Sequence, residues 1–501
     1  MAQRLRVLLM ASEVSPFAKT GGLGDVAAAL PRALRALGHD VRILMPRYRG
    51  VERHAASIRT VVPRLEVPVG DRLVEGALLG TETSAGVPVY FLQQDQYFDR
   101  DGLYGTGEGD YPDNCERFVY FGRGALEALI ALDGAEREAW RPHIVHANDW
   151  QAGLPAVYLR TLYRDHPALK TIATVFTIHN LAYQGVFWHH DMPLTGLGWD
   201  VFTPAGIEFY GKINFLKGGL VFSDLLTTVS RTYAAEIRTP EFGSGLEGVL
   251  EERSADLYGV VNGIDYEQWN PAKDAALARP YSAGEPEGRA ACREALRREL
   301  GLDAGPGPLV FLVTRLVPQK GLELALDGLP GMLEAGCRVA ILGSGDAALE
   351  EAWSQAAARH PGVVVARIGY DPALASRMYA GGDCLLMPSR YEPCGLSQLI
   401  ALRYGAVPVV RRTGGLADTV TEFDAARRAG TGFLFDGLTA DALVEAVRRA
   451  AAIFQRPELW SALVKNAMTE DFSWDASARE YAALYRKIVR PQAARPSRRS
   501  R

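Results

Sequence analysis

The segment 389–397 combines a carboxylate, a proline and a glycine in a spacing that suits a sugar site. Proline drives the preceding residue out of the helical region, so Glu392 is expected in an extended turn before Pro393. Gly395 then lets the backbone approach a ligand, and a helix is predicted to begin near Leu396. Such a carboxylate would face sugar hydroxyls or a developing oxocarbenium ion. The alternative is a solvated loop carboxylate, which the neighbouring residues make the weaker interpretation.

Two cations, Arg315 and Lys320, follow a predicted strand and precede a predicted helix. When a sugar leaves a nucleoside diphosphate, negative charge develops on the phosphate, and fixed cations there stabilise the transition state. Cations are mildly unfavourable at the start of a helix. Their presence in this place therefore favours a diphosphate clamp over two merely exposed side chains.

A Thr-Gly-Gly-Leu sequence occurs twice, once after Lys19 and once after Arg412. Both copies lie between a predicted strand and a predicted helix, where backbone N–H groups can approach an anion. A single Gly-Gly turn is more often only a tight connection. The matched pair, each led by a cation, predicts a phosphate-bearing ligand.

Polar side chains end two predicted strands of the first half: Asp149 and Trp150 follow one, and His179 and Asn180 end the other. Doubly wound folds place ligand-binding groups at such strand ends. Asp149 and Trp150 combine a hydrogen-bonding group with a stacking surface, which is typical of a sugar site. For His179 alone, a structural role is an equally good interpretation. The sequence has no HExxH pattern and no clustered Cys and His residues, and we expect no Asp-x-Asp pair that holds a metal diphosphate, so we predict no metal site.

The elements that must position these residues alternate between strand and helix along the chain, which is the pattern of parallel α/β sheets. A helix after the first strand is indicated by apolar residues at helical spacing, namely Leu23, Val26, Leu30, Leu34 and Leu37. The expected strands are 6–10, 41–45, 143–147, 173–178, 225–229, 309–314, 338–342, 363–368, 384–387 and 407–410. We expect an α/β protein with two doubly wound, Rossmann-like domains facing across a cleft.

Length and composition exclude several classes of protein. A chain of 501 residues is too long for one ordinary core. The net charge of -4 argues against a nucleic-acid partner, and no stretch is long and apolar enough to span a membrane. Five cysteines without CxxC spacing indicate a reducing compartment, and the first apolar run is too short for a signal peptide. The expected location is cytoplasmic.

Beyond these local features, the chain resembles bacterial glycogen synthases and plant starch synthases from about residue 6 to about residue 485. The resemblance rests on many collinear motifs rather than on any one of them. They are Lys19-Thr-Gly-Gly-Leu, Tyr111-Pro-Asp-Asn114, His146-Ala-Asn-Asp-Trp150, Thr177-Ile-His-Asn180, Leu181-Ala-Tyr-Gln-Gly185, Val261-Asn-Gly-Ile-Asp265, Arg315 to Lys320, Glu392-Pro-Cys-Gly-Leu396 and Arg412-Thr-Gly-Gly-Leu416.

The resemblance implies a GT-B fold and a retaining hexosyltransferase without cofactor that moves glucose from ADP-glucose onto glycogen or another α-1,4-glucan. It implies catalytic roles for Glu392, Arg315, Lys320, His179 and Asp149. It implies donor-binding roles for Lys19, Gly22, Asn262, Tyr370, Cys394, Gly395, Leu396 and Ser397. Tyr111 and Trp150 would lie on the acceptor side.

The same resemblance implies how the chain is divided. An N-terminal Rossmann-like domain of residues 1–258 would serve the acceptor, and a C-terminal one of residues 259–473 would bind the nucleotide sugar. A helix at 474–489 would return to the first domain, and a basic disordered tail would occupy 490–501.

The family retains anomeric configuration, and we expect Glu392 to position and stabilise the sugar rather than to attack it. Broader GT-B relatives often carry a second glutamate eight positions later, but Ile400 stands there in this chain. That departure favours a glycogen or starch synthase over a general sugar transferase. The alternatives left open are a UDP-glucose-dependent enzyme, a glucan phosphorylase with pyridoxal phosphate, and a non-catalytic glucan-binding or regulatory protein. The oligomeric state is not predicted.

Overall fold

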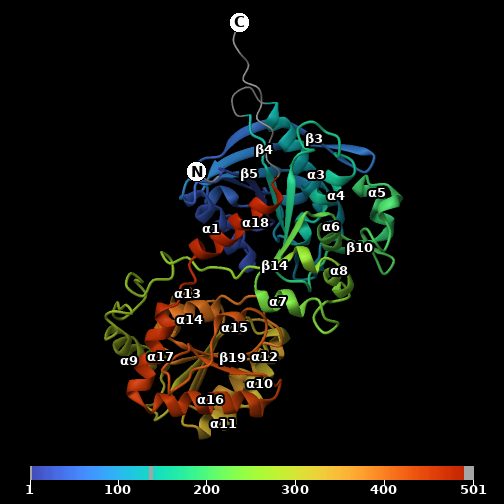
Figure 1. The fold of residues 1–501 in the computed structure, drawn as a ribbon. Coiled ribbons are helices and arrows are strands. Elements are labelled where there is room, and N and C mark those ends of the chain that lie inside the picture. The colour runs from blue at the N-terminus through green and yellow to red at the C-terminus, as the bar shows by residue number, and fades with distance from the viewer. Residues whose placement is uncertain (1–2, 135–138, 490–501) are drawn as a thin grey trace. The chain divides into compact units, whose positions relative to one another are not determined.

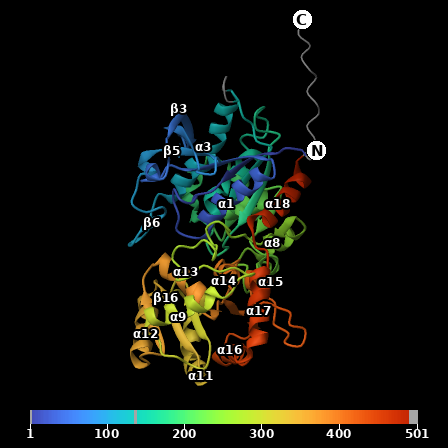
Figure 2. The same ribbon diagram turned by 90° about the vertical axis from the view of Figure 1, so that its left-hand side faces the viewer.

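The computed structural model describes residues 3–134 and 139–489, and the chain divides into two compact units (Figures 1 and 2). The first unit takes the chain up to Thr228, the segment Ile237–Val260 and the part from Ser477 onward. The second takes Val229–Glu236 and Val261–Ala476. An eight-residue segment of the first half therefore packs into the second unit. The basic tail expected at 490–501 lies outside the described residues.

The first unit is built on a nine-stranded sheet in the order β14-β13-β9-β8-β1-β2-β5-β4-β3. Its strands are β1 Arg6–Met10, β2 Asp40–Pro46, β3 Arg59–Val69, β4 Arg72–Glu82, β5 Pro88–Gln93, β8 Ile144–Asn148, β9 Ala173–Ile178, β13 Leu225–Thr228 and β14 Leu257–Gly259. The pairs β2–β1, β1–β8, β8–β9 and β9–β13 are parallel, as predicted. The carboxyl ends of β8 and β9 thus lie side by side at one edge.

A long antiparallel hairpin at the sheet edge was not predicted. Strands β3 and β4 pair antiparallel, and β4 pairs antiparallel with β5. The hairpin turns at Gly70, whose φ of 63° lies in the left-handed region that glycine adopts without cost. The hairpin was missed because it interrupts the strand–helix alternation from which the parallel sheets were predicted.

The described helices of the first unit cover the sheet. They are α1 Gly22–Ala36, α2 Asp95–Phe98, α3 Asn114–Asp133, α4 Leu154–Arg160, α5 Met192–Thr195, α6 Phe215–Phe222, α8 Glu247–Glu252 and most of α18 Trp474–Ile488. Short strands form two small sheets, β6 Gly105–Thr106 with β7 Gly109–Asp110, and β10 Val186–Trp188 with β12 Lys212–Asn214 and β11 Glu208–Phe209. In α1 the predicted apolar stripe is buried except for Leu37, which follows the helix end and is 40% exposed.

The C-terminal helix α18 is anchored in the first unit by buried aromatic side chains, and it lies beside α1 in both views (Figures 1 and 2). The Tyr485 hydroxyl lies 2.7 Å from Nδ1 of His146 on β8. The Lys487 ammonium lies 4.5 Å from the centroid of the Tyr258 ring on β14. These contacts bind the end of the chain to the strands that carry the polar residues of this unit.

The second unit is built on a six-stranded parallel sheet in the order β17-β16-β15-β18-β19-β20. Its strands are β15 Leu309–Val313, β16 Arg338–Gly343, β17 Val364–Ile368, β18 Cys384–Met387, β19 Val407–Arg411 and β20 Phe433–Phe435. All but β20 were predicted. The strand order reverses between β15 and β18, which is where doubly wound sheets open a crevice for ligands.

Alternating side chains divide this unit into two apolar layers, one on each face of the sheet. One layer packs against α10 Leu322–Asp327, α11 Leu329–Glu334, α12 Ala347–Arg359, α16 Ala440–Phe454 and α17 Pro457–Thr469. The other packs against α9 Gly288–Leu300, α13 Pro372–Gly381, α14 Ser397–Tyr404 and α15 Gly414–Thr419. The helix α7 Arg231–Glu236 completes the described helices of the unit. The expected fold of two doubly wound α/β domains is confirmed.

Candidate active site

In the second unit, Glu392 is a buried, paired carboxylate. It is 5% exposed, and its Oε2 lies 2.5 Å from Nζ of Lys320 and 3.1 Å from Oγ of Ser389. The turn before Pro393 and the helix start at Ser397 lie where the sequence predicted them. Burial excludes the interpretation of Glu392 as a solvated loop carboxylate, and the ion pair explains how it remains charged away from water.

The other predicted cation, Arg315, is exposed and, among the described residues, unpaired, unlike Lys320. Its side chain is exposed at the carboxyl end of β15, and within residues 3–134 and 139–489 its guanidinium has no hydrogen bond or ion pair. Lys320 ends a short 3-10 turn, Pro318–Lys320. One cation of the predicted clamp is thus paired with Glu392, while the other stays available to an anion.

The donor-binding residues predicted near Glu392 gather in the second unit. Cys394 is buried, and burial raises the pKa of its thiol to about 12, so it is present as the neutral thiol. Asn262 lies against that thiol, and its buried Oδ1 has no hydrogen-bond partner among the described residues. An unsatisfied buried acceptor is costly, so this oxygen is able to accept a hydrogen bond from a further donor.

The other predicted donor residues differ in exposure. Gly395 has a φ of 74°, and a Cβ there would approach the Gln398 amide to 2.3 Å. Leu396 and Ser397 are half-buried, and Ser397 Oγ lies 3.5 Å from the Val313 carbonyl. Tyr370 is 90% exposed, so its ring faces are open to a stacking partner.

The second Thr-Gly-Gly loop does not offer its first N–H groups to a phosphate. Gly414 N donates to both carboxylate oxygens of Glu236, at 3.0 and 3.1 Å, and Thr413 Oγ1 donates to Oε1 at 2.9 Å. Gly415 N donates to the Glu392 carbonyl. Arg412, the expected cation, pairs with Asp436. The expectation that this loop binds phosphate is therefore corrected: a protein carboxylate occupies the anion position.

The first Thr-Gly-Gly loop, in the first unit, is held in the same manner. Thr20 N and Gly21 N donate to Oε2 of Glu13, at 2.6 and 3.0 Å. Lys19 is exposed and pairs with Asp25 at 2.7 Å. Gly22 begins α1 directly after these donors. The following N–H groups of the helix start are the ones left to a ligand in this copy.

Asp149, in the first unit, has a strained backbone conformation. Its φ of 55° and ψ of 178° fall in a region that only glycine adopts readily, which costs about 1–3 kcal/mol. Its Oδ1 accepts a hydrogen bond from His179 N at 2.7 Å. Burial raises the pKa of the Asp149 carboxyl to about 7, against the opposing effect of that hydrogen bond. Strain of this kind is found at functional sites.

His179 is a neutral hydrogen-bonding group. Burial lowers its pKa to about 3. Its Nε2 lies 2.9 Å from Oδ1 of Asn148, whose Nδ2 donates to the Met10 carbonyl. Because the oxygen of Asn148 can only accept, Nε2 carries the proton and Nδ1 is an acceptor. His146, on the same sheet, bridges Tyr485 and Thr177 and is also held neutral by burial, with a pKa of about 3.

The predicted acceptor-side aromatics are both held by other side chains. Trp150 contacts Phe118 and Phe187, and a Cβ on Gly185 would lie 2.3 Å from its ring. Tyr111 has guanidinium carbons 4.9 Å from its ring centroid, from Arg100 and from Arg117. Its hydroxyl accepts from Gly102 N at 3.1 Å. Both rings are fixed in place, half-buried at the surface.

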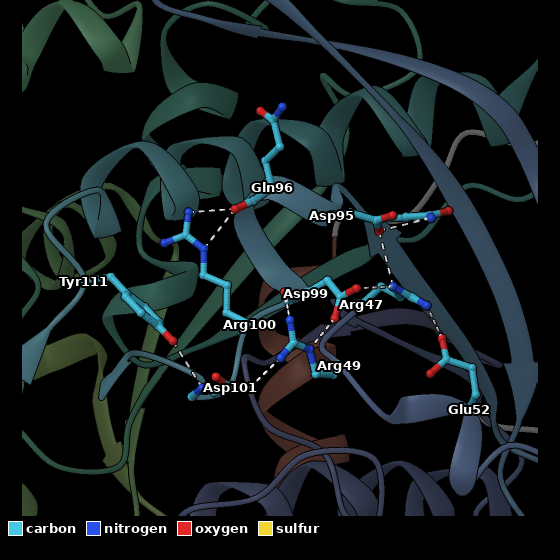
Figure 3. A network of polar contacts seen from close by, with 11 residues as sticks. Arg47, Arg49, Glu52, Asp95, Gln96, Asp99, Arg100, Asp101 and Tyr111 are labelled. Carbon is cyan, nitrogen blue, oxygen red and sulfur yellow. Dashed lines mark hydrogen bonds and ion pairs between the residues drawn. The ribbon is translucent and has the colours of Figure 1, made fainter. Parts of the chain in front are cut away.

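A network of ion pairs surrounds the loop that carries Tyr111 (Figure 3). Arg49 pairs with Asp99 and Asp101, and Arg47 pairs with Glu52 and Asp95. Asp99 and Asp101 form an Asp-x-Asp pair, a spacing that can hold a metal diphosphate, so the expectation of no such pair was wrong as to the sequence. Both carboxylates form ion pairs with Arg49 and thus stabilise the loop.

Among residues 3–134 and 139–489, no group of three or more His, Cys, Asp or Glu side chains is arranged to hold a metal ion. No helix among the same residues is long and apolar enough to cross a membrane.

Comparisons with known proteins agree over nearly the whole chain. Residues 6–252 match the family model described as starch synthase catalytic domain, and residues 293–467 match glycosyl transferases group 1. The chain is 49% identical to a glycogen synthase of Syntrophotalea carbinolica, with 97% of this chain and 99% of that one covered. It is 46% identical to glycogen synthase 2 of Geobacter sulfurreducens, with coverage of 96% and 98%.

The chain belongs to the glycogen and starch synthase family of glycosyltransferases. A solved structure supports the same assignment: the catalytic domain of starch synthase IV from Arabidopsis thaliana, bound to ADP and acarbose, matches with a TM-score of 0.87 and 34% identity. The match covers 97% of this chain and all of that one. The family resemblance seen in the sequence is confirmed, together with the α/β fold that it implied.

Three residues that hold parts of the candidate site were not singled out from the sequence. Glu13 and Glu236, which hold the two Thr-Gly-Gly loops, were missed, as was Asn148, which sets the tautomer of His179. Glu13 follows β1 and ends a strand like Asp149, so the strand-end argument would have found it. Glu236 is remote in sequence from the loop that it holds, and no local signal marks it.

Proposed function

We propose that the protein is a glycogen synthase that transfers glucose from ADP-glucose to the non-reducing end of an α-1,4-glucan, with retention of configuration. The observation that carries the proposal is the buried Glu392–Lys320 pair beside the exposed Arg315, in a chain that shares family and fold with glycogen and starch synthases. Arg315 and Lys320 supply the positive charge that a departing nucleoside diphosphate requires.

On the donor side, we assign the diphosphate to Arg315 and Lys320, with contacts from Lys19, Gly22 and Ser397. The exposed ring of Tyr370 is assigned to adenine. The transferred glucose is assigned to Glu392, Cys394 and Asn262, together with the backbone of Gly395 and Leu396. The Oδ1 atom of Asn262 supports this assignment, because it is buried, has no partner among the described residues and can accept a hydrogen bond from a sugar hydroxyl.

On the acceptor side, we assign Asp149, His179, Trp150 and Tyr111 to the glucan and to the sugar being transferred. The neutral His179 and the high pKa of Asp149 support hydrogen bonding to uncharged hydroxyl groups. The acceptor and donor roles follow the proposed division of the chain at about residue 258.

Glu392 is proposed to hold and stabilise the sugar, while the departing phosphate takes the proton of the acceptor hydroxyl on the same face. The ion pair with Lys320 supports this role, since a carboxylate held by an ammonium is a weaker nucleophile. Bond formation between the acceptor oxygen and C1 then accompanies cleavage of the bond between C1 and the phosphate oxygen. Isolation of a covalent glycosyl–Glu392 adduct would contradict this assignment.

We further propose that the reaction needs no metal ion and that the enzyme works in the cytoplasm. Two cations placed at the leaving diphosphate support the first point. The second is supported by five free cysteines, all buried, which suit a reducing compartment.

The experiment that tests the proposal measures release of nucleoside diphosphate from ADP-glucose and from UDP-glucose, with and without glycogen, in the presence of a chelator. We expect release that depends on glycogen, survives the chelator and is faster with ADP-glucose. Faster release from UDP-glucose would overturn the donor assignment alone. No release from either donor would overturn the catalytic proposal in favour of a glucan-binding or regulatory protein.

A further inference from the structure

Helix α7 is a segment of the first half of the sequence that forms part of the second unit. It follows β13 and lies in the segment Val229–Glu236, which belongs to the second unit. Three polar residues of this segment, Ser230, Thr232 and Glu236, bind backbone or side chains of the donor-binding region. The segment therefore contacts the donor-binding residues 389–397, although these residues follow it by more than 150 positions in the chain.

The first two contacts fix the helix start. Ser230 Oγ donates to the Pro393 carbonyl at 2.5 Å, directly after Glu392, and the same Oγ accepts from Tyr233 N. Thr232 N and Oγ1 donate to Asp418 of α15, at 3.0 and 2.6 Å. Ser230 thus ties the segment to the residue after Glu392, and Thr232 ties it to α15.

The third contact is the carboxylate of Glu236. Its two oxygens accept from Gly414 N, and Oε1 also accepts from Thr413 Oγ1. These are charge-assisted hydrogen bonds, which are roughly twice as strong as neutral ones. Thr413 and Gly414 are both buried. Without the Glu236 carboxylate, their hydrogen-bond donors would therefore lack a partner unless the loop moved to expose them to water.

The backbone of the Thr413–Gly415 loop contacts the backbone of Glu392 and restricts its position. Gly415 N donates to the Glu392 carbonyl at 3.0 Å. At Gly414, with a φ of 43°, a Cβ would lie 1.9 Å from that same carbonyl oxygen, so only glycine allows the approach. The backbone of Glu392 is therefore set by a loop that Glu236 holds, while its carboxylate is set by Lys320 and Ser389.

We propose that Glu236 is a positioning residue for Glu392: its carboxylate fixes the Thr413–Gly415 loop and thereby places the Glu392 carboxylate against Lys320. The proposal deepens the proposed function and rests on it for the role of Glu392. It assigns to α7 a part in catalysis that its place in the sequence does not suggest.

The test compares Glu236→Ala and Glu236→Gln with the control Asp424→Ala. Asp424 is a carboxylate of the same unit that also accepts hydrogen bonds within a loop, from the backbone N–H groups of Ala426 and Arg427. The readouts are kcat, the Kd of ADP, Tm, and hydrogen exchange of the segments 389–397 and 411–417.

We expect Glu236→Ala to lower kcat by about 10–100-fold while the Kd of ADP changes less than about threefold, because positioning acts mainly on the transition state. Glu236→Gln keeps an oxygen that accepts from Thr413 and Gly414, so kcat should return to within about fivefold of the wild type. Exchange at 389–397 should rise in Glu236→Ala and stay unchanged in Asp424→Ala, whose kcat also stays unchanged.

Wild-type kcat in Glu236→Ala would overturn the proposal, and so would an equal loss of kcat in Asp424→Ala at a matched fall in Tm. If Glu236→Ala does not fold, Glu236→Asp replaces it; a carboxylate shortened by one methylene should lower kcat with little change in Tm, and unchanged kcat would overturn the proposal. A wild-type protein without transferase activity would refute the proposed function instead, and hydrogen exchange at 389–397 would still decide whether Glu236 holds the Glu392 loop.

Discussion

The strand ends of the two units carry different kinds of polar group. In the second unit, Glu392 and Lys320 are charged and already paired, and Arg315 is exposed. In the first unit, burial raises the pKa of Asp149 to about 7 and lowers that of His179 to about 3. One edge thus carries fixed charge and the other carries groups held near or at neutrality. The difference fits the two proposed substrates, a charged nucleotide sugar for the second unit and an uncharged glucan for the first.

The largest effect is expected from removing the cation of the second unit. Lys320→Ala leaves the buried Glu392 without its partner and removes charge from the leaving group, so kcat should fall by about 10²–10³-fold. The Kd of glycogen should change less than about twofold, because the glucan is assigned to neutral groups. Steady-state ADP release and glycogen affinity electrophoresis measure the two quantities. Lys320→Arg is the matched control and should retain more activity; equal losses of turnover and glycogen binding would contradict the comparison.

The first unit should respond to pH through Asp149. Its folded pKa of about 7 lies above the ordinary value, so the fold favours the neutral form. The resulting stability is present below the ordinary pKa of about 4 and is lost as pH rises towards 7. Asp149→Asn is neutral at every pH and should raise Tm by roughly 2–5 °C at pH 8, with a smaller gain at pH 5.

Differential scanning calorimetry at the two pH values measures this difference. The matched control is Asp424→Asn, a carboxylate of the other unit, which should show no such gain. A rise in Tm for Asp149→Asn that is larger at pH 5 than at pH 8 would show that the folded state favours the charged form of Asp149. The first unit would then not differ from the second in the charge of its polar groups.

A smaller effect is expected where the C-terminal helix meets the neutral cluster. Tyr485→Phe removes the contact between its hydroxyl and Nδ1 of His146, a buried hydrogen bond worth about 1 kcal/mol. Urea unfolding should register that loss. The kcat should stay within about twofold of the wild type, since His146 is assigned no contact with substrate. A large loss of kcat at unchanged stability would show that this part of the first unit takes part in the reaction.

The smallest effect is expected from the charged network around the Tyr111 loop (Figure 3). Arg49→Ala removes two exposed ion pairs, with Asp99 and Asp101. Because water and salt screen such pairs, Tm should shift by no more than about 1 °C, and less at high salt. Thermal unfolding at low and at high salt measures it. A shift of several degrees would show that exposed charge in the first unit matters as much as the buried pair of the second.

Local patterns in the sequence were enough for much of the scaffold. Most parallel strands of both sheets were predicted from apolar runs, and the turn at Glu392 was predicted from the proline after the carboxylate. The parallel strands β5, β14 and β20 were not predicted. The hairpin of β3 and β4 was not, since it breaks the alternation of strand and helix. Its turn at Gly70 and Asp71 lies between two runs of alternating side chains, which would have been a usable signal.

The candidate site was predicted less completely than the fold. Glu392, Lys320, Asp149 and His179 were chosen for their type and for their place after strands. Their partners were harder to find, because hydrogen bonds join residues that are remote along the chain. Glu236 holds a loop that begins 177 positions later, and no local spacing encodes such a contact.

What the sequence alone determined is the set of chemical groups, the class of fold and the family. Periodicity and turn residues act over a few positions, and so they can be read without the structure. What only the tertiary structure decided is the state of those groups: that Glu392 is paired, that Asp149 has a pKa of about 7, and that two carboxylates fill the Thr-Gly-Gly loops. Charge and burial depend on every neighbour in space, and the neighbours are chosen by packing.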